Sequence, residues 1–279
     1  MTIDDFLAKD ASLCSFSGSY NIIFSRLNDP AASVACITEA VELDPAIAAK
    51  TLHMANSSLY GFPEPIDTLH RAIAVIGPEQ LRQIVMSTVV IEHFRGLPVM
   101  GVDMYSFWRH SLAVGVLSRS IARFRREPNI ERLYLYGMLH DLGRLLMFMH
   151  LENRTEDLIN IRERDQSLLF EAEAEFLGFD HAAIGAALLE AWGMSPAQVE
   201  TTRWHHAPAR ARRFPVETAI VHVADSLANA LRLGSSGERF VPPVAPEAFD
   251  RIGLDMPAYE RIVDDARQHL NQTQAILLD

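Results

Sequence analysis

Apolar residues recur along this chain at the three- and four-residue spacing of amphipathic helices, and strand-like alternation is hard to find. Several expected helix starts carry a capping side chain before a proline, as at Asp29-Pro30, Asp44-Pro45 and Ser195-Pro196. Glycines close other apolar runs, at Gly77, Gly178, Gly193 and Gly234. The pattern predicts an all-α, multi-helix bundle of about ten to thirteen helices with essentially no sheet.

One break in the helical pattern divides the chain into two parts. The segment "FRGLPVMGVDM", which starts at Phe94, places two glycines and a proline between strongly periodic stretches. We therefore predict an N-terminal helical part at residues 1–95 and a C-terminal part at residues 96–279. A second loop, "RLGSSGERFVPPVAP", precedes a final helix that we expect to begin near Pro257.

The segment "NSSLYGFPEPID", residues 56–67, has the composition of an ordered connection. Asn56 and Ser57 can end a helix by bonding backbone groups, a glycine permits a turn, and two prolines stiffen the loop. The alternative is a surface that docks a partner protein or covers a binding pocket, and both interpretations stay open.

Composition and charge narrow the function classes. With 279 residues and 49% hydrophobic residues, the chain can bury a full core. The net charge of −11 argues against a protein that tracks the phosphates of nucleic acid. The two cysteines, Cys14 and Cys36, suggest free thiols, and neither a signal peptide nor a membrane span is evident. We expect a soluble, cytoplasmic protein that binds neither nucleic acid nor a membrane.

The stretch "YLYGMLHDLGRLLMFM" places His140 beside Asp141 among apolar residues, where a buried charge is costly unless a partner or an ion neutralises it. Other histidines and acids lie in similar apolar surroundings: His110, His181, His205-His206 and Asp225. All of them except the His205-His206 pair are expected in a helix or at its first residue. In a helical bundle such side chains can converge on a metal site. His222, in contrast, is expected on the surface.

Five imidazoles and two carboxylates exceed the need of one tetrahedral ion. They suit two divalent ions, iron, manganese, zinc or nickel, roughly 3.5 to 4 Å apart with one bridging carboxylate. Such a pocket is net positive, attracts phosphate, and lowers the pKa of bound water, so it suits phosphoester hydrolysis. Asp141 and Arg144 are the candidate catalytic residues, with Arg144 as a phosphate clamp. A metal-free His/Asp hydrogen-bond network remains the alternative.

The ordered blocks of the chain resemble the HDOD proteins, a helical signalling branch of the HD superfamily of metal-dependent phosphohydrolases that is related to HD-GYP. The resemblance is carried by "DPAIAAKTLHMANSSLYGFPEPIDTLHRAIAVIG", "FWRHSLAVGVLSRSIA", "GMLHDLGRLLM", "LGFDHAAIGAALLEAWGMSP" and "WHHAP". It implies an all-helical fold and a role in bacterial signal transduction. It also implies that four residues match the HD metal ligands: His110, His140, Asp141 and Asp225. Three further residues match the extra histidines of two-metal relatives: His181, His205 and His206.

Departures from the related enzymes bear on activity. "HHAPARARRFP" replaces the "HHExxDGxGYP" signature, Ser106 replaces a glutamate that some relatives carry, and Arg144 replaces a lysine. These changes disfavour cyclic di-GMP hydrolysis. Three hypotheses follow: a signalling-output module with a metal-binding pocket, a phosphohydrolase acting on a phosphate-containing small molecule, and a non-catalytic scaffold with a relic His/Asp cluster that binds a signalling partner protein.

Overall fold

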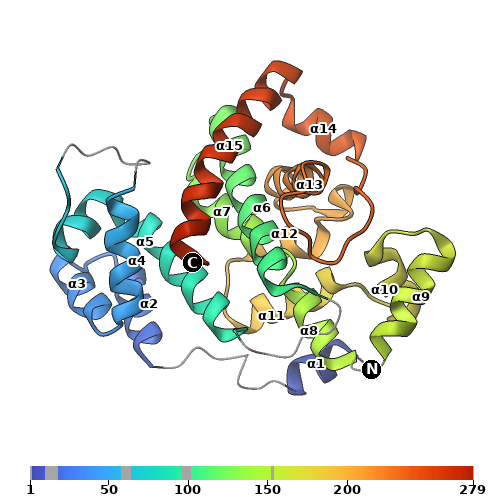
Figure 1. The fold of residues 1–279 in the computed structure, drawn as a ribbon, viewed down its shortest axis with the longest axis horizontal. Helices are drawn as coiled ribbons and strands as arrows, with labels where there is room; N and C mark the ends of the chain where they lie inside the picture. Colours follow the sequence, from blue (N-terminus) through green and yellow to red (C-terminus); the bar gives the residue numbers. More distant parts are fainter. Residues whose placement is uncertain (1, 10–17, 58–63, 96–101, 152–153, 279) are drawn as a thin grey trace. The chain divides into compact units, whose positions relative to one another are not determined.

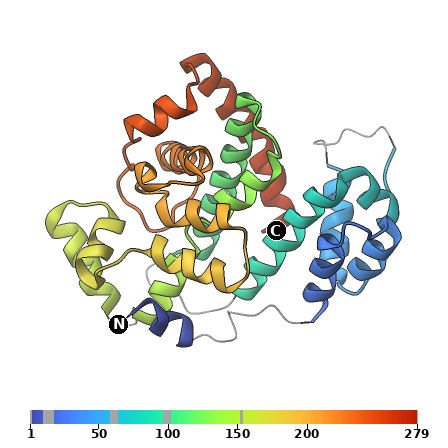
Figure 2. The same cartoon turned by 180° about the vertical axis from the view of Figure 1, so that it is seen from behind.

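The computed structural model describes residues 2–9, 18–57, 64–95, 102–151 and 154–278, and within these ranges every regular element is a helix. The all-α prediction is confirmed, and the described helices outnumber the ten to thirteen expected (Figures 1 and 2). The helices are α1 (Ile3–Lys9), α2 (Ser19–Asn28), α3 (Val34–Glu42), α4 (Pro45–Ala55), α5 (Leu69–His93), α6 (Met104–Arg125), α7 (Glu131–Met138), α8 (Leu142–Leu151), α9 (Thr155–Asp165), α10 (Leu169–Leu177), α11 (His181–Ala191), α12 (Pro196–Trp204), the short 3-10 helix η2 (Pro208–Arg210), α13 (Pro215–Ala230), α14 (Pro246–Ile252) and α15 (Met256–Leu277). In the part that the structure describes, none of them has the length and apolar character that crossing a membrane requires.

The chain forms two compact units, each with its own contacts. One unit combines Met1–Cys14 with Gly96–Ala266, and the other combines Ser15–Arg95 with Arg267–Asp279. The units differ from the predicted parts, 1–95 and 96–279, because each chain end groups with the other part of the sequence. Helices α2 to α5, blue to teal in Figure 1, belong to the second unit, and α6 to α14 belong to the first.

The capping signals predicted two of three helix starts. Asp44 accepts hydrogen bonds from the backbone N–H of Ala46 and Ile47, and Ser195 caps α12 through Gln198. The start predicted at Asp29-Pro30 is wrong. Asp29 instead follows the end of α2 and its side chain closes a turn by accepting from the N–H of Ala31, so the same local bond serves a turn rather than a helix.

Two features of the second unit show how its connections are held. Gly77 adopts φ 81° and ψ 164° within α5 and precedes Pro78, so the predicted stop is a break between two helical stretches. The Asn56 side chain donates to the carbonyls of Leu52 and Ile66 and accepts from the Ile66 N–H, which confirms it as a helix-ending residue. Residues 58–63 of the predicted connection lie outside the described residues.

Glycines allow helices of the first unit to approach closely. A Cβ on Gly137 of α7 would lie 2.6 Å from the Val114 carbonyl oxygen of α6, and one on Gly115 would lie 2.8 Å from the Tyr134 oxygen. Helix α6 also packs against α13, and its buried face is rich in leucine and valine. The resulting core fixes helix α6, which carries His110.

A second close approach joins α8 to α11. A Cβ on Gly143 would lie 2.0 Å from the carbonyl oxygen of His181 and 2.4 Å from the Gly185 nitrogen. We expect Gly143→Ala to force these helices apart and to lower the free energy of unfolding by about 1–3 kcal/mol or more, measured by urea titration.

Gly185→Ala, on the facing helix, is the matched control for that variant. Its added Cβ would lie 3.2 Å from its nearest neighbour, which requires only a small adjustment. Equal destabilisation by both substitutions would show that the 2.0 Å contact does not limit the helix approach.

The final helix α15 begins next to the predicted Pro257, but α14 before it escaped prediction. The predicted loop after α13 is not a plain connection. Ser236 is buried, and the backbone N–H of Ser235 donates to the carbonyl of Ser106 at the start of α6. This segment therefore closes over the first unit instead of only linking two helices.

Candidate metal centre

The His140-Asp141 pair lies in the turn between α7 and α8 and in neither helix. Leaving the helix lets the two neighbouring side chains reach one point, whereas consecutive helical residues would diverge by about 100°. The turn is fixed because His140 Nδ1 lies 2.6 Å from the Gly137 carbonyl oxygen.

The other predicted residues arrive from four more places in the first unit. His110 lies in α6, His181 is the first residue of α11, and Asp225 lies in α13, while His205 and His206 follow α12. The imidazoles of His110, His140, His181 and His205 are fully buried, and Asp141 and Asp225 expose only 2% and 5% of their surface.

Seven predicted side chains form two groups of possible metal ligands, within each of which the ligand atoms lie within 4.8 Å of one another. One group contains Asp141, His181, His205 and His206, and the other contains His110, His140 and Asp225. Within the second group, His110 Nε2 lies 3.2 Å and His140 Nε2 lies 3.7 Å from Asp225 Oδ1. The structure thus brings together every residue predicted as a ligand.

Asp141 lies between the two groups. Its Oδ2 is 3.3 Å from His140 Nε2 and 3.9 Å from His110 Nε2, both in the second group. Its Oδ1 is 2.8 Å from His181 Nε2 and 3.7 Å from His205 Nε2. One carboxylate oxygen therefore faces each group, which is the placement that a bridging ligand needs.

Hydrogen bonds at the far side of the rings set which nitrogen faces the centre. The Nδ1 atoms of His140 and His205 lie 2.6 and 2.7 Å from backbone carbonyl oxygens, and His181 Nδ1 lies 2.5 Å from Glu173 Oε2. Each of these acceptors requires Nδ1–H as donor, so the neutral rings direct Nε2 lone pairs inward. Among the described residues, His140 Nε2, His205 Nε2 and Asp141 Oδ1 have no hydrogen-bond partner.

The imidazole nitrogens and carboxylates that face one another are stabilised by positive charge between them. Burial by itself lowers the pKa of His140, but the carboxylates of Asp141 and Asp225 raise it to about 10 when only protons are available. Burial and the Arg144 guanidinium lower the pKa of His181, whereas Glu173 and Asp141 raise it to about 9. The negative charges of the buried carboxylates are thus balanced either by protons on these histidines or by a bound cation.

The two remaining histidines of the first group stay neutral. Burial, followed by the neighbouring His140 and His181, lowers the pKa of His205 to about 3. The pKa of His206 falls well below its ordinary value, through burial and then the adjacent His205. Neutral imidazole is the form that binds a metal ion.

Arg144 is fully engaged by buried partners. Its guanidinium bonds Glu173 Oε1 at 3.2 Å, Ser236 Oγ at 2.7 Å and Asp141 Oδ2 at 3.5 Å. Nη2 also lies 2.9 Å from His181 Nδ1, but the shorter contact assigns that ring proton to Glu173. Asp141 keeps a depressed pKa because the charges of Arg144, His140 and His181 outweigh the effect of its burial. Arg144 thus supports the cluster, and its predicted role as a phosphate clamp stays a prediction.

Sequence analysis missed Glu173 and Ser236 and placed His222 wrongly. Glu173 sits in "AEAEFL", where charged residues separated by alanines give no sign of burial, yet it is completely buried. His222 is buried: its Nδ1 donates to the His205 carbonyl at 2.7 Å and its Nε2 accepts from the Ala245 N–H at 2.9 Å. Only its position three residues before Asp225 hinted at this role.

The space beside the cluster is small. It is lined by Asp141, Arg144, His206, Asp225, Asn229, Ser236, Glu238 and Pro242, and it leaves no room for a water-sized sphere. Three of these residues belong to the segment after α13, which covers this side of the cluster. The geometry suits a bound ion, and a larger ligand requires that the segment move.

Comparison with known proteins finds a matching family model and solved structures with a similar helical fold. A family model of the HDOD domain matches residues 13–208, a range that includes every predicted ligand except Asp225. The fold is similar to an HDOD domain protein of unknown function from Geobacter sulfurreducens, with TM-score 0.80 and 20% identity over 98% of this chain and 100% of that chain. It is also similar to a candidate phosphohydrolase from Shewanella amazonensis SB2B, with TM-score 0.76 and 21% identity over 97% and 96% of the two chains.

Two further relatives are similar to the chain. A candidate metal-dependent phosphohydrolase from Shewanella amazonensis SB2B has TM-score 0.61 and 20% identity, covering 95% of this chain and 99% of that chain. A curated, uncharacterised protein from Treponema pallidum (strain Nichols) is 21% identical over 181 residues, which cover 64% of this chain and 35% of that protein. At these identities the solved structures show the fold alone.

Proposed function

Since the chain belongs to the HDOD family, we propose that it is a bacterial signalling-output protein whose buried His/Asp cluster binds one or two divalent metal ions. The observation that carries this proposal is the inward direction of the imidazole lone pairs. Rings whose Nδ1 atoms already donate to carbonyl or carboxylate oxygens face two carboxylates with Nε2. Acceptors that face acceptors in a buried site need a cation between them.

The residues of the two ligand groups fit such an ion. Asp141, His181, His205 and His206 would hold one, and the group of His110, His140 and Asp225 would hold a second, with Asp141 shared. The nitrogen and oxygen donor set suits iron, manganese, zinc or nickel. A bound divalent ion supplies Lewis acidity and lowers the pKa of a water molecule that it binds.

Phosphoester hydrolysis is the second function that we propose, on a phosphate-containing small molecule. The shared carboxylate of Asp141 favours it, because two adjacent ligand groups are the arrangement used for in-line displacement at phosphorus. The segment that contains Ser236 must then open, since no room for a substrate exists beside the cluster. The absent "HHExxDGxGYP" signature still disfavours cyclic di-GMP as that substrate.

Elemental analysis tests the metal proposal. Protein purified without chelator should contain near-stoichiometric iron, manganese, zinc or nickel, and His140→Ala and Asp225→Ala should lose it. His269→Ala, on α15 and outside both groups, is the control and should retain the metal. Metal-free protein that folds normally would instead support a scaffold that binds a signalling partner protein.

A hydrolysis screen separates an enzyme from a metal-binding scaffold. Generic phosphodiesters, cyclic dinucleotides and nucleoside polyphosphates are assayed with several added metals. Activity that disappears in Asp141→Ala supports hydrolysis by this cluster, whereas activity that survives the substitution comes from another protein.

Metal binding should release protons. In the metal-free protein the pKa of His140 is about 10 and that of His181 about 9, so both rings are protonated at pH 7.5. A metal at their Nε2 atoms must displace those protons, and its affinity therefore rises with pH and falls as the solution is acidified. Calorimetric titration with Mn²⁺ in two buffers of different ionisation enthalpy should detect the release of at least one proton; heat independent of the buffer contradicts this.

Glu173 should influence metal affinity without touching the metal. Its carboxylate accepts from His181 Nδ1 and from the His181 backbone N–H at 2.9 Å. Glu173→Gln weakens the orientation of this ring, and we expect an affinity loss of about 10–100-fold, as measured for other outer-shell partners. Glu175→Gln, two residues along α10 on the exposed surface, should change the affinity less than twofold in the same competition assay.

A further inference from the structure

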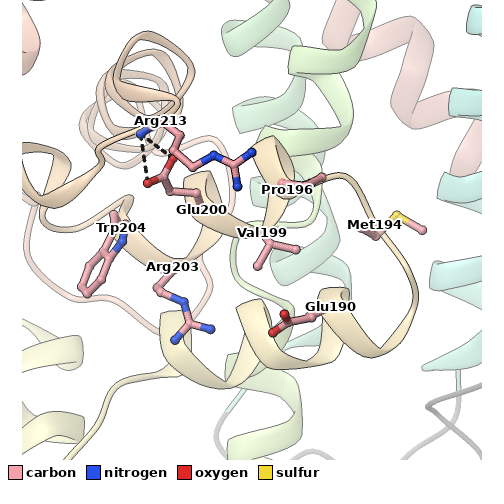
Figure 3. Close-up of a pocket in the computed structure, with 8 residues that line it drawn as sticks. All are labelled: Glu190, Met194, Pro196, Val199, Glu200, Arg203, Trp204 and Arg213. Atoms are coloured by element: carbon pink, nitrogen blue, oxygen red, sulfur yellow. Dashed lines mark hydrogen bonds between the residues drawn. The ribbon is translucent and has the colours of Figure 1, made fainter.

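A surface pocket of about 410 Å³ lies in the first unit, apart from the His/Asp cluster. Its wall is formed by the end of α11, the turn that follows, helix α12 and the segment before α13 (Figure 3). The lining residues are Glu190, Met194, Pro196, Val199, Glu200, Arg203, Trp204 and Arg213. None of them is a predicted metal ligand, and the volume falls within the range of about 300–1,000 Å³ typical of small-molecule sites.

The pocket combines apolar surface with two arginines. Met194, Val199 and Trp204 provide side chains that can cover an apolar group. In the part of the chain that the structure describes, neither Arg203 nor Arg213 forms an ion pair. Other arginines of this unit, such as Arg132, Arg144 and Arg162, do form ion pairs.

Of the two acids that line the pocket, Glu200 is already bound by the backbone. The Glu200 carboxylate accepts from the N–H groups of Arg212, Arg213 and Phe214 at 2.8 to 3.2 Å. Partial burial raises the pKa of Glu200, but the backbone donors and then the Arg213 charge lower it by more, so the carboxylate stays ionised and bound. Glu200 therefore fixes the loop that carries Arg213. The Arg213 guanidinium lies 5.3 Å from the centre of the Phe214 ring and feels the Glu200 charge without pairing directly with it, so it can still bind an anion.

From this arrangement we propose that the pocket binds a small organic anion that carries an apolar group. A carboxylate, sulfonate or phosphate would pair with the guanidinium groups of Arg203 and Arg213, and the apolar group would cover Val199 and its neighbours. The exposed Glu190 at the rim disfavours ligands of high negative charge. The proposal is independent of metal at the His/Asp cluster, because the two sites share no residue.

The probe for this site is anilinonaphthalene sulfonate, which joins one anionic group to an aromatic body and fluoresces when bound. We expect saturable binding of one equivalent to the full chain and at least a tenfold loss of affinity in the double variant Arg203→Gln, Arg213→Gln. Arg203→Lys keeps the charge and should retain part of the affinity. N-phenylnaphthylamine lacks the sulfonate. It should bind the wild type more weakly than anilinonaphthalene sulfonate does, and it should bind the double variant with the same affinity as the wild type.

Arg212→Gln is the matched control, since Arg212 is exposed, adjacent to Arg213 and outside the pocket lining. It should change the affinity less than twofold. Circular dichroism confirms that each variant is folded. Unchanged binding in the double variant, an equal loss in Arg212→Gln, or the binding of several probes per chain overturns the proposal.

Discussion

Asp141→Asn should weaken metal binding at both ligand groups, not at one. The substitution preserves the shape of the side chain but removes the charge whose two oxygens face His140 on one side and His181 on the other. We expect the affinity for the first and the second metal equivalent to fall by more than about 100-fold, beyond the about 10–100-fold cost of losing an outer-shell partner. Metal analysis after dialysis and competition with a chromogenic chelator measure both equivalents.

Asp250→Asn is the control for this result, because Asp250 is exposed on α14 and belongs to neither ligand group. It should leave the metal content unchanged. If Asp141→Asn removed one equivalent and left the other at wild-type affinity, Asp141 would serve a single group and the shared-carboxylate arrangement would be wrong.

Arg144→Ala should destabilise the metal-free protein by about 3–5 kcal/mol, because it leaves buried carboxylates without their counter-charge. The guanidinium bonds Glu173 and lies 3.5 Å from Asp141, and all three side chains expose at most 2% of their surface. Ser236 loses its partner as well, so the segment after α13 should loosen. Urea unfolding of chelator-treated protein measures the change, and hydrogen exchange locates it.

Arg239→Ala provides the contrast, since the ion pair between Arg239 and Glu163 is exposed to solvent. Surface pairs of this kind contribute about 0–1 kcal/mol. A loss of the same small size in Arg144→Ala would mean that the buried carboxylates take up protons at no cost, and that Arg144 does not stabilise the cluster.

Arg144→Lys distinguishes charge from geometry. Lysine preserves one positive charge but cannot bond Glu173 and Ser236 together through a planar fork. We expect a destabilisation between those of the alanine variant and the wild type.

Local chemistry explains which parts of the fold could be predicted. The Asp44 and Ser195 caps act over two or three residues, so sequence alone located them. Asp29 has the same motif but forms a turn, because local bonds do not decide between turn and helix when packing favours one of them. The additional helix α14 escaped prediction for a different reason: seven residues carry too little periodicity to stand out from a loop.

The candidate ligands could be predicted because the free-energy cost of burying a polar side chain depends on its near neighbours in the sequence. A histidine or an aspartate that is buried among leucines needs a hydrogen-bond partner or a counter-charge in any fold. Seven such residues therefore indicated one shared site. The outer partners gave no such signal. Glu173 lies among alanines and other glutamates that give no sign of burial, and it is buried where it bonds Arg144 and His181.

The sequence by itself determined that the chain is helical, that its polar core residues are histidines and aspartates, and that these suit a divalent metal. Tertiary structure decided the rest: the shared position of Asp141, the inward Nε2 atoms, the support by Arg144 and Glu173, and the closing of the segment around Ser236. The physical reason is the separation along the sequence over which each effect acts. Helical periodicity and the desolvation of charge depend on a residue and its near neighbours, whereas ligand geometry depends on packing between segments far apart in the chain, such as the contact that Gly143 allows between α8 and α11.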